Sequence, residues 1–525
     1  MMIKLKNKKQ NSGFTIVELL IVIVIIAILA TLTIVAYNGI QKKAGDSAIR
    51  SDISQAAKQL AILEATNGNF PDNTDTLKKS NGTTYQYTYD SATKSYCLTV
   101  SNQWSEYHIT NTNTTPQDGV CDGHTSQIGS GGGGGPAPPT ISTDWSVIAI
   151  GGNTSCGLYL GTAYCWGAND WGQIGDGTGT TRGLPTAINT SGVLSGKTIT
   201  DISVGSYNVC VRTTENKMYC SGMGARGQLG NGSTADTSVM VAPTMTGALS
   251  GKTITKISLQ SQSTCAIASD SKAYCWGLGS SGEIGNNATT VNITTPTAVT
   301  NTGVLSGKTL IDISSGYTGA CVLDSTGKAY CWGRGTEGQL GNGTTPATSL
   351  VPVAVTSTGV LSGKTLTKIR SGLKSVCAID SAGSMYCWGQ NNYGQLGNGS
   401  TTNSSNPVAV PLTGLLAGKT ILDVGVGTYS TCVLASDSNV YCWGFNTNGQ
   451  LGNGSTTNSL TPVAVDTSGA LSGKTVQIIT SGPYNDYTCV RASDGQVYCW
   501  GLNPRGEFGN NTVSPSAVPV LTTHP

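Results

Sequence analysis

The sequence predicts a two-part chain: a long N-terminal α-helix with a small α+β domain, then an all-β domain that forms a seven-bladed β-propeller. Three observations predict this. The chain has 525 residues, enough for two or three domains. Only 11% of the residues are charged and 70 are glycine, which is typical of short strands joined by tight turns. One pattern also recurs about every 55 residues over residues 144–525, a period typical of four-stranded propeller blades.

The repeat is marked by its cysteines and its strands. The second cysteine of each pair recurs after 55, 55, 56, 56, 55 and 57 residues, from Cys165 to Cys499. Four strands, which we name A, B, C and D, are expected at Asp201-Ile-Ser-Val-Gly, Val209-Cys-Val-Arg, Lys217-Met-Tyr-Cys and Val239-Met-Val-Ala-Pro. Gly227-Gln-Leu-Gly-Asn-Gly lies between C and D. All seven units fit this frame from Val147 to Val520.

The 16 cysteines form an even, regularly spaced set, which indicates disulfides and an oxidising compartment. Pairing Cys210 with Cys220 opposes Val211 to Tyr219, a consistent antiparallel register between strands B and C. The expected pairs are Cys156/Cys165, Cys210/Cys220, Cys265/Cys275, Cys321/Cys331, Cys377/Cys387, Cys432/Cys442 and Cys489/Cys499. Each bond would add roughly 2–3 kcal/mol. A zinc site would need C-x2-C spacing with histidines nearby, and the only histidines are His108, His124 and His524, so no zinc site is expected. No cofactor is expected, and no motif specifies calcium, although Asp- and Asn-rich turns could hold it weakly.

The N-terminus has the features of an export signal. Residues 1–13 are short and basic and end in Gly13, and an apolar run from Leu19 to Ala36 follows Phe14-Thr15-Ile16-Val17-Glu18. Because the candidate cleavage site precedes the apolar core, that core would survive processing, unlike the core of an ordinary secretory signal. The lone acid Glu18 at the edge of the run is costly in a bilayer, which suggests that it has a function.

The motif from Gly13 to Glu18 resembles the cleavage and methylation signal of the type IV prepilin family. The resemblance implies that a prepilin peptidase cuts between Gly13 and Phe14 and that Phe14 is N-methylated. It also implies that Glu18 pairs with the N-terminal amine of another pilin subunit during assembly. The protein would wait in the cytoplasmic membrane and then reach the cell surface in an extracellular pilus. A plain membrane anchor is the alternative, since about 18 apolar residues can span a bilayer.

The expected domains are a leader at 1–13, a transmembrane and assembly helix at 14–66, a small pilin domain at 67–124, a Gly/Pro linker at 125–143 and the propeller at 144–525. One apolar stripe is expected on the helix, made by Ile49, Ile53, Ala56, Leu60 and Leu63. The alternating segments 85–89 and 96–100 predict a hairpin. Cys97 and Cys121 would close a loop near the end of the small domain, as in many pilins.

The repeats resemble the RCC1 (regulator of chromosome condensation) family through the Tyr-Cys-Trp-Gly core, as at Tyr274–Gly277, and through Gly-Gln-Leu-Gly-Asn-Gly, as at 338–343. The resemblance covers about 380 residues and implies the propeller fold. The family's guanine-nucleotide exchange role is not expected here, because that partner is intracellular whereas this domain is predicted to be exported. Extracellular binders and enzyme inhibitors within the family fit better.

Two recurring features are expected to be structural. A tryptophan follows the second cysteine at Trp166, Trp276, Trp332, Trp388, Trp443 and Trp500, with Ser221 in the second repeat, and blade-to-blade packing is expected rather than a sugar-binding ring. Leu194-Ser-Gly-Lys-Thr198 recurs between strands D and A. Its distance from the upstream glycine departs from that of a phosphate-binding loop, and no strand-loop-helix context follows, so we expect a repeated turn.

Antiparallel geometry places the A–B and C–D loops on one face and the B–C and D–A loops on the other. The first face varies between repeats. Its varied residues are Trp171, Arg226, Ser281, Glu337, Tyr393, Asn448 and Arg505 in the C–D loops, and Tyr207, Tyr317, Lys374, Tyr429 and Tyr484 in the A–B loops. A constant frame with varied, partly aromatic tips resembles a ligand-binding face. Neutral drift of exposed loops is the alternative.

We therefore predict a binding protein and not an enzyme: a minor type IV pilin-like surface protein whose propeller adheres to an extracellular glycan or protein. The propeller has no histidine except His524, and Asp201, Asp312 and Asp423 occupy equivalent starts of strand A, as structural residues would. A pseudopilin-like role in a secretion or DNA-uptake machine and a polysaccharide-acting enzyme are the alternatives. The formal charge of +2 argues against nucleic acid as a partner.

Overall fold

The computed structural model describes residues 145–525 except 318, 483 and 485, together with parts of the stretch between residues 49 and 121. The chain divides into two compact units, Met1–Pro139 and Thr140–Pro525. Each unit has its own apolar core and is described by itself.

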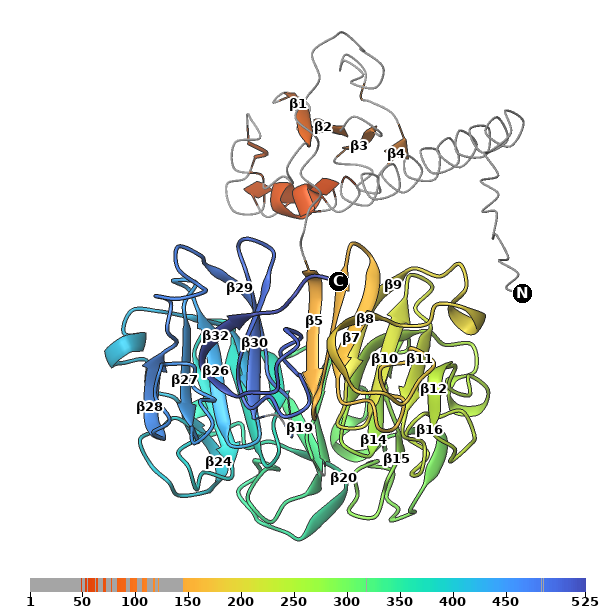
Figure 1. Cartoon of the computed structure of the whole chain (residues 1–525), viewed down its shortest axis with the longest axis vertical. Coiled ribbons are helices and arrows are strands. Elements are labelled where there is room, and N and C mark those ends of the chain that lie inside the picture. The colour runs from red at the N-terminus through yellow and green to blue at the C-terminus, as the bar shows by residue number, and fades with distance from the viewer. Residues whose placement is uncertain are drawn as a thin grey trace, which may run out of the picture. The chain divides into compact units, whose positions relative to one another are not determined.

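The first unit packs helical residues against one antiparallel sheet (Figure 1). Helical residues lie between positions 49 and 64. The sheet has the order β1 (Thr84–Asp90), β2 (Ser95–Ser101), β3 (Glu106–Thr110) and β4 (Gln117–Asp118). The pairing of β1 with β2 confirms the predicted hairpin. Ile49, Ile53, Ala56 and Leu60 are buried in one cluster with residues of β2, which confirms the apolar face predicted for this part of the helix.

The membrane-spanning prediction falls outside the described residues. In the part of the chain that the structure does describe, no helix combines the length and the apolarity needed to cross a bilayer. The apolar run from Leu19 to Ala36 is not in that part.

The second unit holds seven four-stranded antiparallel sheets, each in the order A-B-C-D. The A strands are β5 (Trp145–Gly151), β9 (Ile199–Val204), β13 (Ile254–Leu259), β17 (Leu310–Ser315), β21 (Leu366–Ser371), β25 (Ile421–Val426) and β29 (Val476–Thr480). The B strands are β6 (Thr154–Tyr159), β10 (Asn208–Thr213), β14 (Ser263–Ala268), β18 (Gly319–Asp324), β22 (Ser375–Asp380), β26 (Ser430–Ala435) and β30 (Tyr487–Ala492).

The C strands are β7 (Thr162–Gly167), β11 (Met218–Gly222), β15 (Ala273–Gly277), β19 (Ala329–Arg334), β23 (Met385–Gly389), β27 (Val440–Gly444) and β31 (Val497–Gly501). The D strands are β8 (Arg182–Ala187), β12 (Thr237–Val241), β16 (Ile293–Ala298), β20 (Thr348–Ala354), β24 (Ser404–Ala409), β28 (Ser459–Ala464) and β32 (Ser516–Leu521). Short 3₁₀ turns precede five of the A strands: η1 (Gly192–Leu194), η2 (Gly247–Leu249), η3 (Gly303–Leu305), η4 (Gly359–Leu361) and η5 (Gly414–Leu416).

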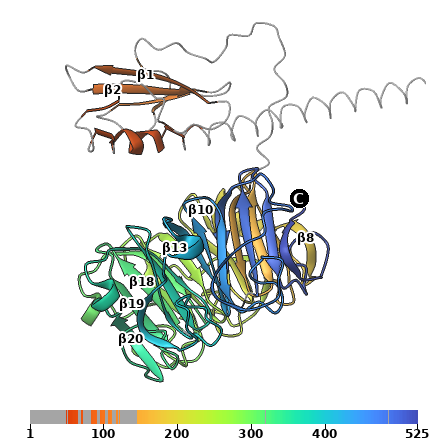
Figure 2. The ribbon, with the colours of Figure 1, turned by 90° about the vertical axis from the view of Figure 1, so that its left-hand side faces the viewer.

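The sheets are arranged in a ring. Each A strand contacts the A strand of the next sheet, and β29 and β30 contact β5, so the last sheet packs on the first. The apolar clusters cross between sheets: one joins Ile267 of β14 to Ile313 of β17 and Trp332 of β19. Figures 1 and 2 show the loops gathered at the two ends of the strands. No sheet of the described ring therefore holds a core of its own, and its stability depends on its neighbours.

The disulfides hold the B and C strands of each sheet together. In the first unit the structure joins Cys97 to Cys121. In the second unit, with Cα atoms 4.0–4.1 Å apart, it joins the seven expected pairs: Cys156 to Cys165, Cys210 to Cys220, Cys265 to Cys275, Cys321 to Cys331, Cys377 to Cys387, Cys432 to Cys442 and Cys489 to Cys499. Beside Cys210 and Cys220, the pairing of Val211 with Tyr219 confirms the predicted register.

The paired cysteines of the ring are core residues. Cys275, Cys387 and Cys442, the second cysteines of the third, fifth and sixth sheets, are all 0% exposed. Each belongs, with its partner, to an apolar cluster that reaches into the next sheet. These cysteines are thus cross-links within the core and do not contribute to an accessible site. Because they are buried, a reductant should reach them only when a sheet opens locally.

The first strand begins earlier than the sequence frame placed it. β5 starts at Trp145 rather than at Val147, and Trp145 is fully buried against Tyr159 and Trp166. The other A strands begin with a buried aliphatic residue at this place, such as Ile199, so the tryptophan substitutes for an aliphatic residue of the core.

Candidate ligand-binding face

One hydrogen bond fixes the variable position of every C–D loop. The main-chain N–H of Trp171 donates to Oε1 of Gln173, and the same contact recurs in all seven repeats at 2.6–3.0 Å. The acceptors are Gln173, Gln228, Glu283, Gln339, Gln395, Gln450 and Glu507. This bond holds the backbone of the variable residue whatever its side chain is, so the side chain can change without loss of this contact.

The next sheet in the ring holds this Gln or Glu in turn. The indole N–H of Trp276 donates to the main-chain oxygen of Gln228 at 2.9 Å, and the other five tryptophans make the equivalent bond at 2.7–3.0 Å. In the second repeat the hydroxyl of Ser221 donates to the oxygen of Gln173 at 2.9 Å. All six tryptophans are at most 1% exposed, which confirms the prediction that they pack between sheets. Gly230 has φ +72°, and a Cβ there would lie 2.6 Å from the Trp276 indole.

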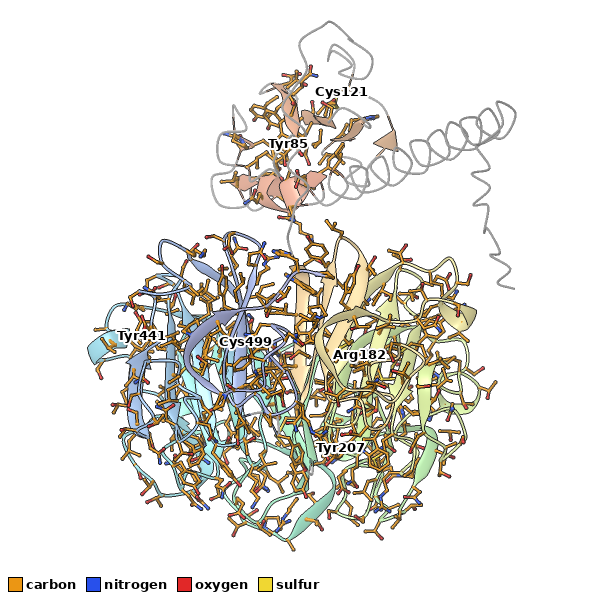
Figure 3. All side chains as sticks on the ribbon, in the orientation of Figure 1. Tyr85, Cys121, Arg182, Tyr207, Tyr441 and Cys499 are labelled. Atoms are coloured by element: carbon orange, nitrogen blue, oxygen red, sulfur yellow. A yellow bond between two sulfur atoms is a disulfide. The ribbon has the colours of Figure 1, made fainter. Side chains whose placement is uncertain are left out.

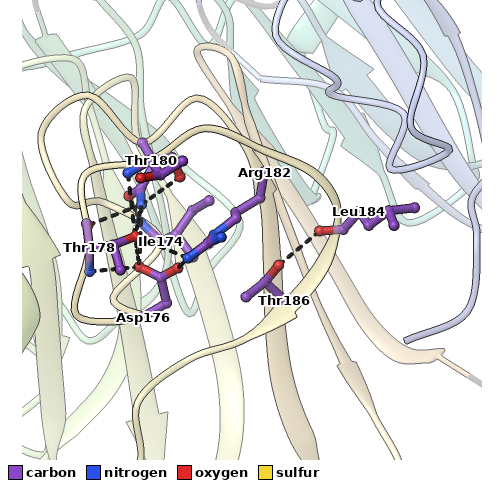
Figure 4. A network of polar contacts seen from close by, with 8 residues as sticks. Ile174, Asp176, Thr178, Thr180, Arg182, Leu184 and Thr186 are labelled. Carbon is purple, nitrogen blue, oxygen red and sulfur yellow. Dashed lines mark hydrogen bonds and ion pairs between the residues drawn. The ribbon is translucent and has the colours of Figure 1, made fainter. Parts of the chain in front are cut away.

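The C–D loops are also held from within. In the first sheet, Asp176 accepts the N–H and hydroxyl of Thr178 and lies 2.6 Å from Nη2 of Arg182 (Figure 4). Although burial acts in the opposite direction, the hydrogen bonds from Thr178 and Arg182 lower the pKa of Asp176. Side chains of this C–D loop therefore hold it together from within.

Aromatic side chains from two sheets meet on this face. Tyr393, in a C–D loop, lies 5.1 Å from Tyr429, in the A–B loop of the next sheet, and 4.9 Å from Phe445, measured between ring centroids. Tyr429 and Phe445 are 6.2 Å apart. The three half-buried rings brace one another in tilted and edge-on contacts, which aromatic pairs favour.

A second aromatic contact joins distant sheets. Tyr317, in the A–B loop of the fourth sheet, meets Tyr484, in that of the seventh, with ring centroids 4.8 Å apart. Tyr484 has a φ of 70°, a conformation that is costly for a residue other than glycine and that concentrates at functional sites. Its hydroxyl is buried and has no hydrogen-bond partner among the described residues.

Asp486 connects these two aromatic groups. It lies in the same loop as Tyr484, and its charge helps to raise the pKa of Tyr429, after burial and the neighbouring Tyr393. Burial raises the pKa of Asp486 itself, against a hydrogen bond from Thr428. We call Tyr317, Tyr393, Tyr429, Phe445, Tyr484 and Asp486 the tyrosine patch. It extends over the fourth to seventh sheets.

The other varied residues lie apart from this patch. Trp171, which is 41% exposed, meets Tyr207 edge-on with centroids 6.5 Å apart, on the first and second sheets (Figure 3 labels Tyr207). Arg505 lies 3.4 Å from Asp170, and Lys374 lies 3.3 Å from Glu337. The remaining varied residues, Arg226, Ser281 and Asn448, are half-buried and hold their loops through the backbone bond described above.

The opposite face is nearly the same in each repeat. The lysine of each Gly-Lys-Thr turn pairs with an acid of the same sheet's B–C turn at 3.1–3.8 Å: Lys197 with Glu215, Lys252 with Asp270, Lys308 with Asp324, Lys364 with Asp380, Lys419 with Asp437 and Lys474 with Asp494. Although burial opposes the shift, hydrogen bonds from Tyr441, Asn439 and Lys419 lower the pKa of Asp437 to about 2. Because these lysines form ion pairs within the fold, the structure confirms the prediction that the Gly-Lys-Thr segments are structural turns.

The carboxylates near the starts of the A strands form ion pairs as well. Asp312 lies 3.1 Å from Arg370 and 3.9 Å from Lys256, both on neighbouring sheets. Asp423 lies 3.2 Å from Lys368, and Asp201 lies 3.3 Å from Arg212. They link strands, as predicted. Within the described residues, no cluster of three His, Cys, Asp or Glu side chains is placed to hold a metal ion.

The processing residues Gly13, Phe14 and Glu18 lie outside the described residues, so their roles stay predictions. Sequence reasoning missed Phe445, Arg334 and Asp486. Phe445 and Arg334 occupy the position just after each Trp-Gly pair, which also varies between repeats and could have been found by that signal. Asp486 has no counterpart in the shorter A–B loops, and only the fold brings it to Tyr429.

Comparison with known proteins places the repeats in a family. The model of the regulator of chromosome condensation (RCC1) repeat matches residues 161–211, 326–379, 382–434 and 437–484, and a second model of that repeat matches 199–228, 310–339, 366–395, 421–450 and 480–507. The prokaryotic N-terminal methylation motif matches residues 8–34.

Individual relatives cover the repeats. The chain is 27% identical over 365 residues to the ultraviolet-B receptor UVR8 of Arabidopsis thaliana, which is 69% of this chain and 78% of the receptor. It is 29% identical over 363 residues to the human E3 ubiquitin-protein ligase HERC2, which is 68% of this chain but only 7% of the ligase.

Solved structures agree on the fold alone. Prp20p of Saccharomyces cerevisiae matches with a TM-score of 0.59 at 18% identity, over 73% of this chain and 88% of that one. Human WBSCR16 matches with a TM-score of 0.56 at 18% identity, over 65% and 85%. The chain therefore belongs to the regulator of chromosome condensation (RCC1) repeat family, and it joins those repeats to a prokaryotic N-terminal methylation motif.

Proposed function

We propose that this protein is a minor type IV pilin-like surface protein whose seven-bladed propeller binds an extracellular ligand through the A–B/C–D face. The methylation motif and the disulfides are consistent with a pilin-like protein outside the cell. A domain of about 380 residues would be hard to accommodate on every subunit of a packed filament, which favours a minor subunit.

Assembly follows the prepilin route in this proposal. A prepilin peptidase cuts between Gly13 and Phe14, Phe14 is N-methylated, and residues 14–66 form the helix that waits in the cytoplasmic membrane. Glu18 then pairs with the N-terminal amine of another pilin subunit. Two opposite charges that satisfy each other would set the register in an otherwise apolar bundle.

The observation that carries the binding role is the fixed frame beneath seven varied side chains. The same backbone hydrogen bond holds all seven, while the lysines of the other face are committed to ion pairs. The chain enters this unit at the start of β5, at the B–C/D–A end of the strands, where Figure 1 also shows the C-terminus. The chain therefore enters this unit at the end opposite the varied loops.

The test is a binding screen of the oxidised full chain in detergent against glycans and host surface proteins. The comparison is a variant with Trp171→Ala, Tyr393→Ala and Arg505→Ala, three tips from different C–D loops. We expect at least tenfold weaker binding, measured well below the Tm of both proteins, because loss of the Tyr393 contacts with Tyr429 and Phe445 should lower the Tm slightly. A matched control changes Val193, Val304 and Val360 to Ala; these are exposed on the opposite face.

Each other outcome points elsewhere. Equal binding by the wild type and the triple variant would place the site outside this face. Absence of binding, together with co-purification with secretion or DNA-uptake components, would favour the pseudopilin-like role instead.

A further inference from the structure

Tyr317 of the tyrosine patch also lines a crevice between the fourth and fifth sheets. Arg334, Gln339 and Lys374 line the same crevice. Its interior volume is about 20 Å³, which is room for about one water-sized group. The crevice is therefore too small for a sugar ring but large enough for one oxygen-bearing substituent of a ring that rests outside it.

Hydrogen-bond donors outnumber acceptors among these side chains. Lys374 is neutralised by Glu337, whose carboxylate also accepts a hydrogen bond from Asn403 at 3.2 Å. Arg334 donates through Nε to Thr336 at 3.0 Å, and no carboxylate of the described residues pairs with its guanidinium. Nε2 of Gln339 is buried and has no hydrogen-bond partner there. A carboxylate would complete this set, because its two oxygens match the guanidinium fork and accept from an amide.

We propose that the ligand of this face is a glycan with a carboxylated sugar, whose ring rests on Tyr317 and Tyr484 and whose carboxylate enters the crevice beside Arg334 and Gln339. This inference rests on the binding face proposed above. Tyr317 is 36% exposed and braced by Tyr484, so it offers a preformed apolar surface to the C–H face of a sugar.

A protein partner fits this place less well. A stable protein interface needs about 800 Å² on each side with an apolar centre. The patch instead offers a few half-buried rings beside tyrosine hydroxyls and one carboxyl, Asp486, which can bond to sugar hydroxyls.

The test uses the oxidised full chain in detergent with two acidic trisaccharides, sialyllactose and glucuronyl-lactose, each also as its uncharged methyl ester, and with lactose. We expect one acid to bind at least tenfold more tightly than its own ester by calorimetry, and the two acids separate a sialic from a uronic source. Arg334→Gln should abolish the preference for the acid, because it removes the cation and its pair of parallel N–H donors while leaving a polar side chain. Tyr317→Ala should weaken the binding of the acid and of its ester to the same extent.

Matched controls lie on the opposite face of the same sheet. Lys328→Gln removes the same charge from a B–C turn, and Ile311→Ala shortens a side chain that is 44% exposed. Both should bind as the wild type does. Equal binding of acid and ester, or a preference that survives Arg334→Gln at an unchanged Tm, would overturn the assignment.

The two proposals can fail separately. If no trisaccharide binds but the Trp171/Tyr393/Arg505 triple variant still loses binding to a host surface, the carboxylated sugar is wrong and the face stands. If that binding also survives in the triple variant, the face itself is wrong.

Discussion

At the scale of single residues, the seven Gln or Glu side chains that accept the backbone hydrogen bond of the C–D loops are not chemically equal. Five are glutamine and two are the acids Glu283 and Glu507. Both acids are at most 2% exposed, and burial, against the hydrogen bonds they accept, raises the pKa of Glu283 and raises that of Glu507 to about 7. Oε1 of Glu507 has no partner among the described residues. Burial therefore favours the neutral, protonated carboxyl at these two positions, whereas a glutamine amide is neutral without a bound proton.

Stability should consequently depend on pH through Glu507. The folded state holds the proton up to about pH 7, whereas the unfolded chain releases it near pH 4.3, so this contribution is full below pH 4.3 and is lost as the pH rises to 7. The loss is about 4 kcal/mol at most. Glu507→Gln should be more stable than the wild type at pH 8 and nearly equal to it at pH 4.5, as measured by urea unfolding. Glu215→Gln, at an exposed site whose pKa is lowered, should leave the dependence between pH 5 and 8 intact. Parallel profiles for wild type and Glu507→Gln would contradict this assignment.

At the scale of one sheet, the second repeat shows how an exception is accommodated. Six repeats combine the buried tryptophan with a proline in strand D, such as Trp276 with Pro296. The second combines Ser221 with Met240 instead. Beside Gly175, the Met240 Cε and the Ser221 Oγ lie 3.1 and 2.9 Å from the place of a Cβ, so the methionine fills space that the indole fills elsewhere. The two residues should therefore be energetically coupled.

Ser221→Trp alone should destabilise the fold by about 1–3 kcal/mol, because the indole and Met240 compete for the same space. Met240→Pro alone should also destabilise, by leaving that space unfilled. The double variant should regain at least half of the summed loss. The measurement is a double-mutant cycle by chemical unfolding. Trp276→Ser, beside Pro296, gives the uncompensated cost, about 3–5 kcal/mol. Strictly additive effects of Ser221→Trp and Met240→Pro would show that the two residues do not share this space.

At the scale of the whole molecule, the ring is closed by contacts that the other sheet junctions lack. Strand B of the last sheet begins with Tyr487, where the other sheets have a smaller residue such as Ser430. Its hydroxyl lies 2.9 Å from the Ser155 hydroxyl and donates to the main-chain oxygen of Thr154 at 3.0 Å. Burial strongly raises the pKa of Tyr487, so it stays a neutral donor.

Tyr487→Phe should loosen this closure. It leaves the buried oxygens of Thr154 and Ser155 with one partner fewer, at a cost of about 1–3 kcal/mol. Hydrogen exchange should rise first in β5 and β6 and little in β17 to β20, on the far side of the ring. Tyr498→Phe is the control, because that hydroxyl bonds Asp494 within its own sheet at 2.6 Å. Uniformly faster exchange in all sheets would instead indicate a loss of global stability.

The sequence predicts the features that recur in every repeat. It does not predict the contacts that form only when the ring of sheets closes. The opposed residues Cys210 and Cys220 determine the register of strands B and C, because strand pairing within a hairpin is local. The same pattern recurs seven times and predicts the seven sheets. The meeting of Tyr317 with Tyr484 joins the fourth and seventh sheets, so no spacing in the chain reveals it. Asp486 likewise gains its raised pKa from burial in the assembled ring and not from its neighbours in sequence.

The disulfide pattern has a consequence for how the protein matures. All eight bonds join cysteines that are consecutive in the chain, from Cys97 with Cys121 to Cys489 with Cys499. A polypeptide that emerges from a translocation channel presents its thiols to an oxidant one after another. Joining them in order of appearance yields the native set with no bond to reshuffle, and reshuffling is the slow step of oxidative folding. Such a chain can mature in an envelope that contains a thiol oxidase and no disulfide isomerase.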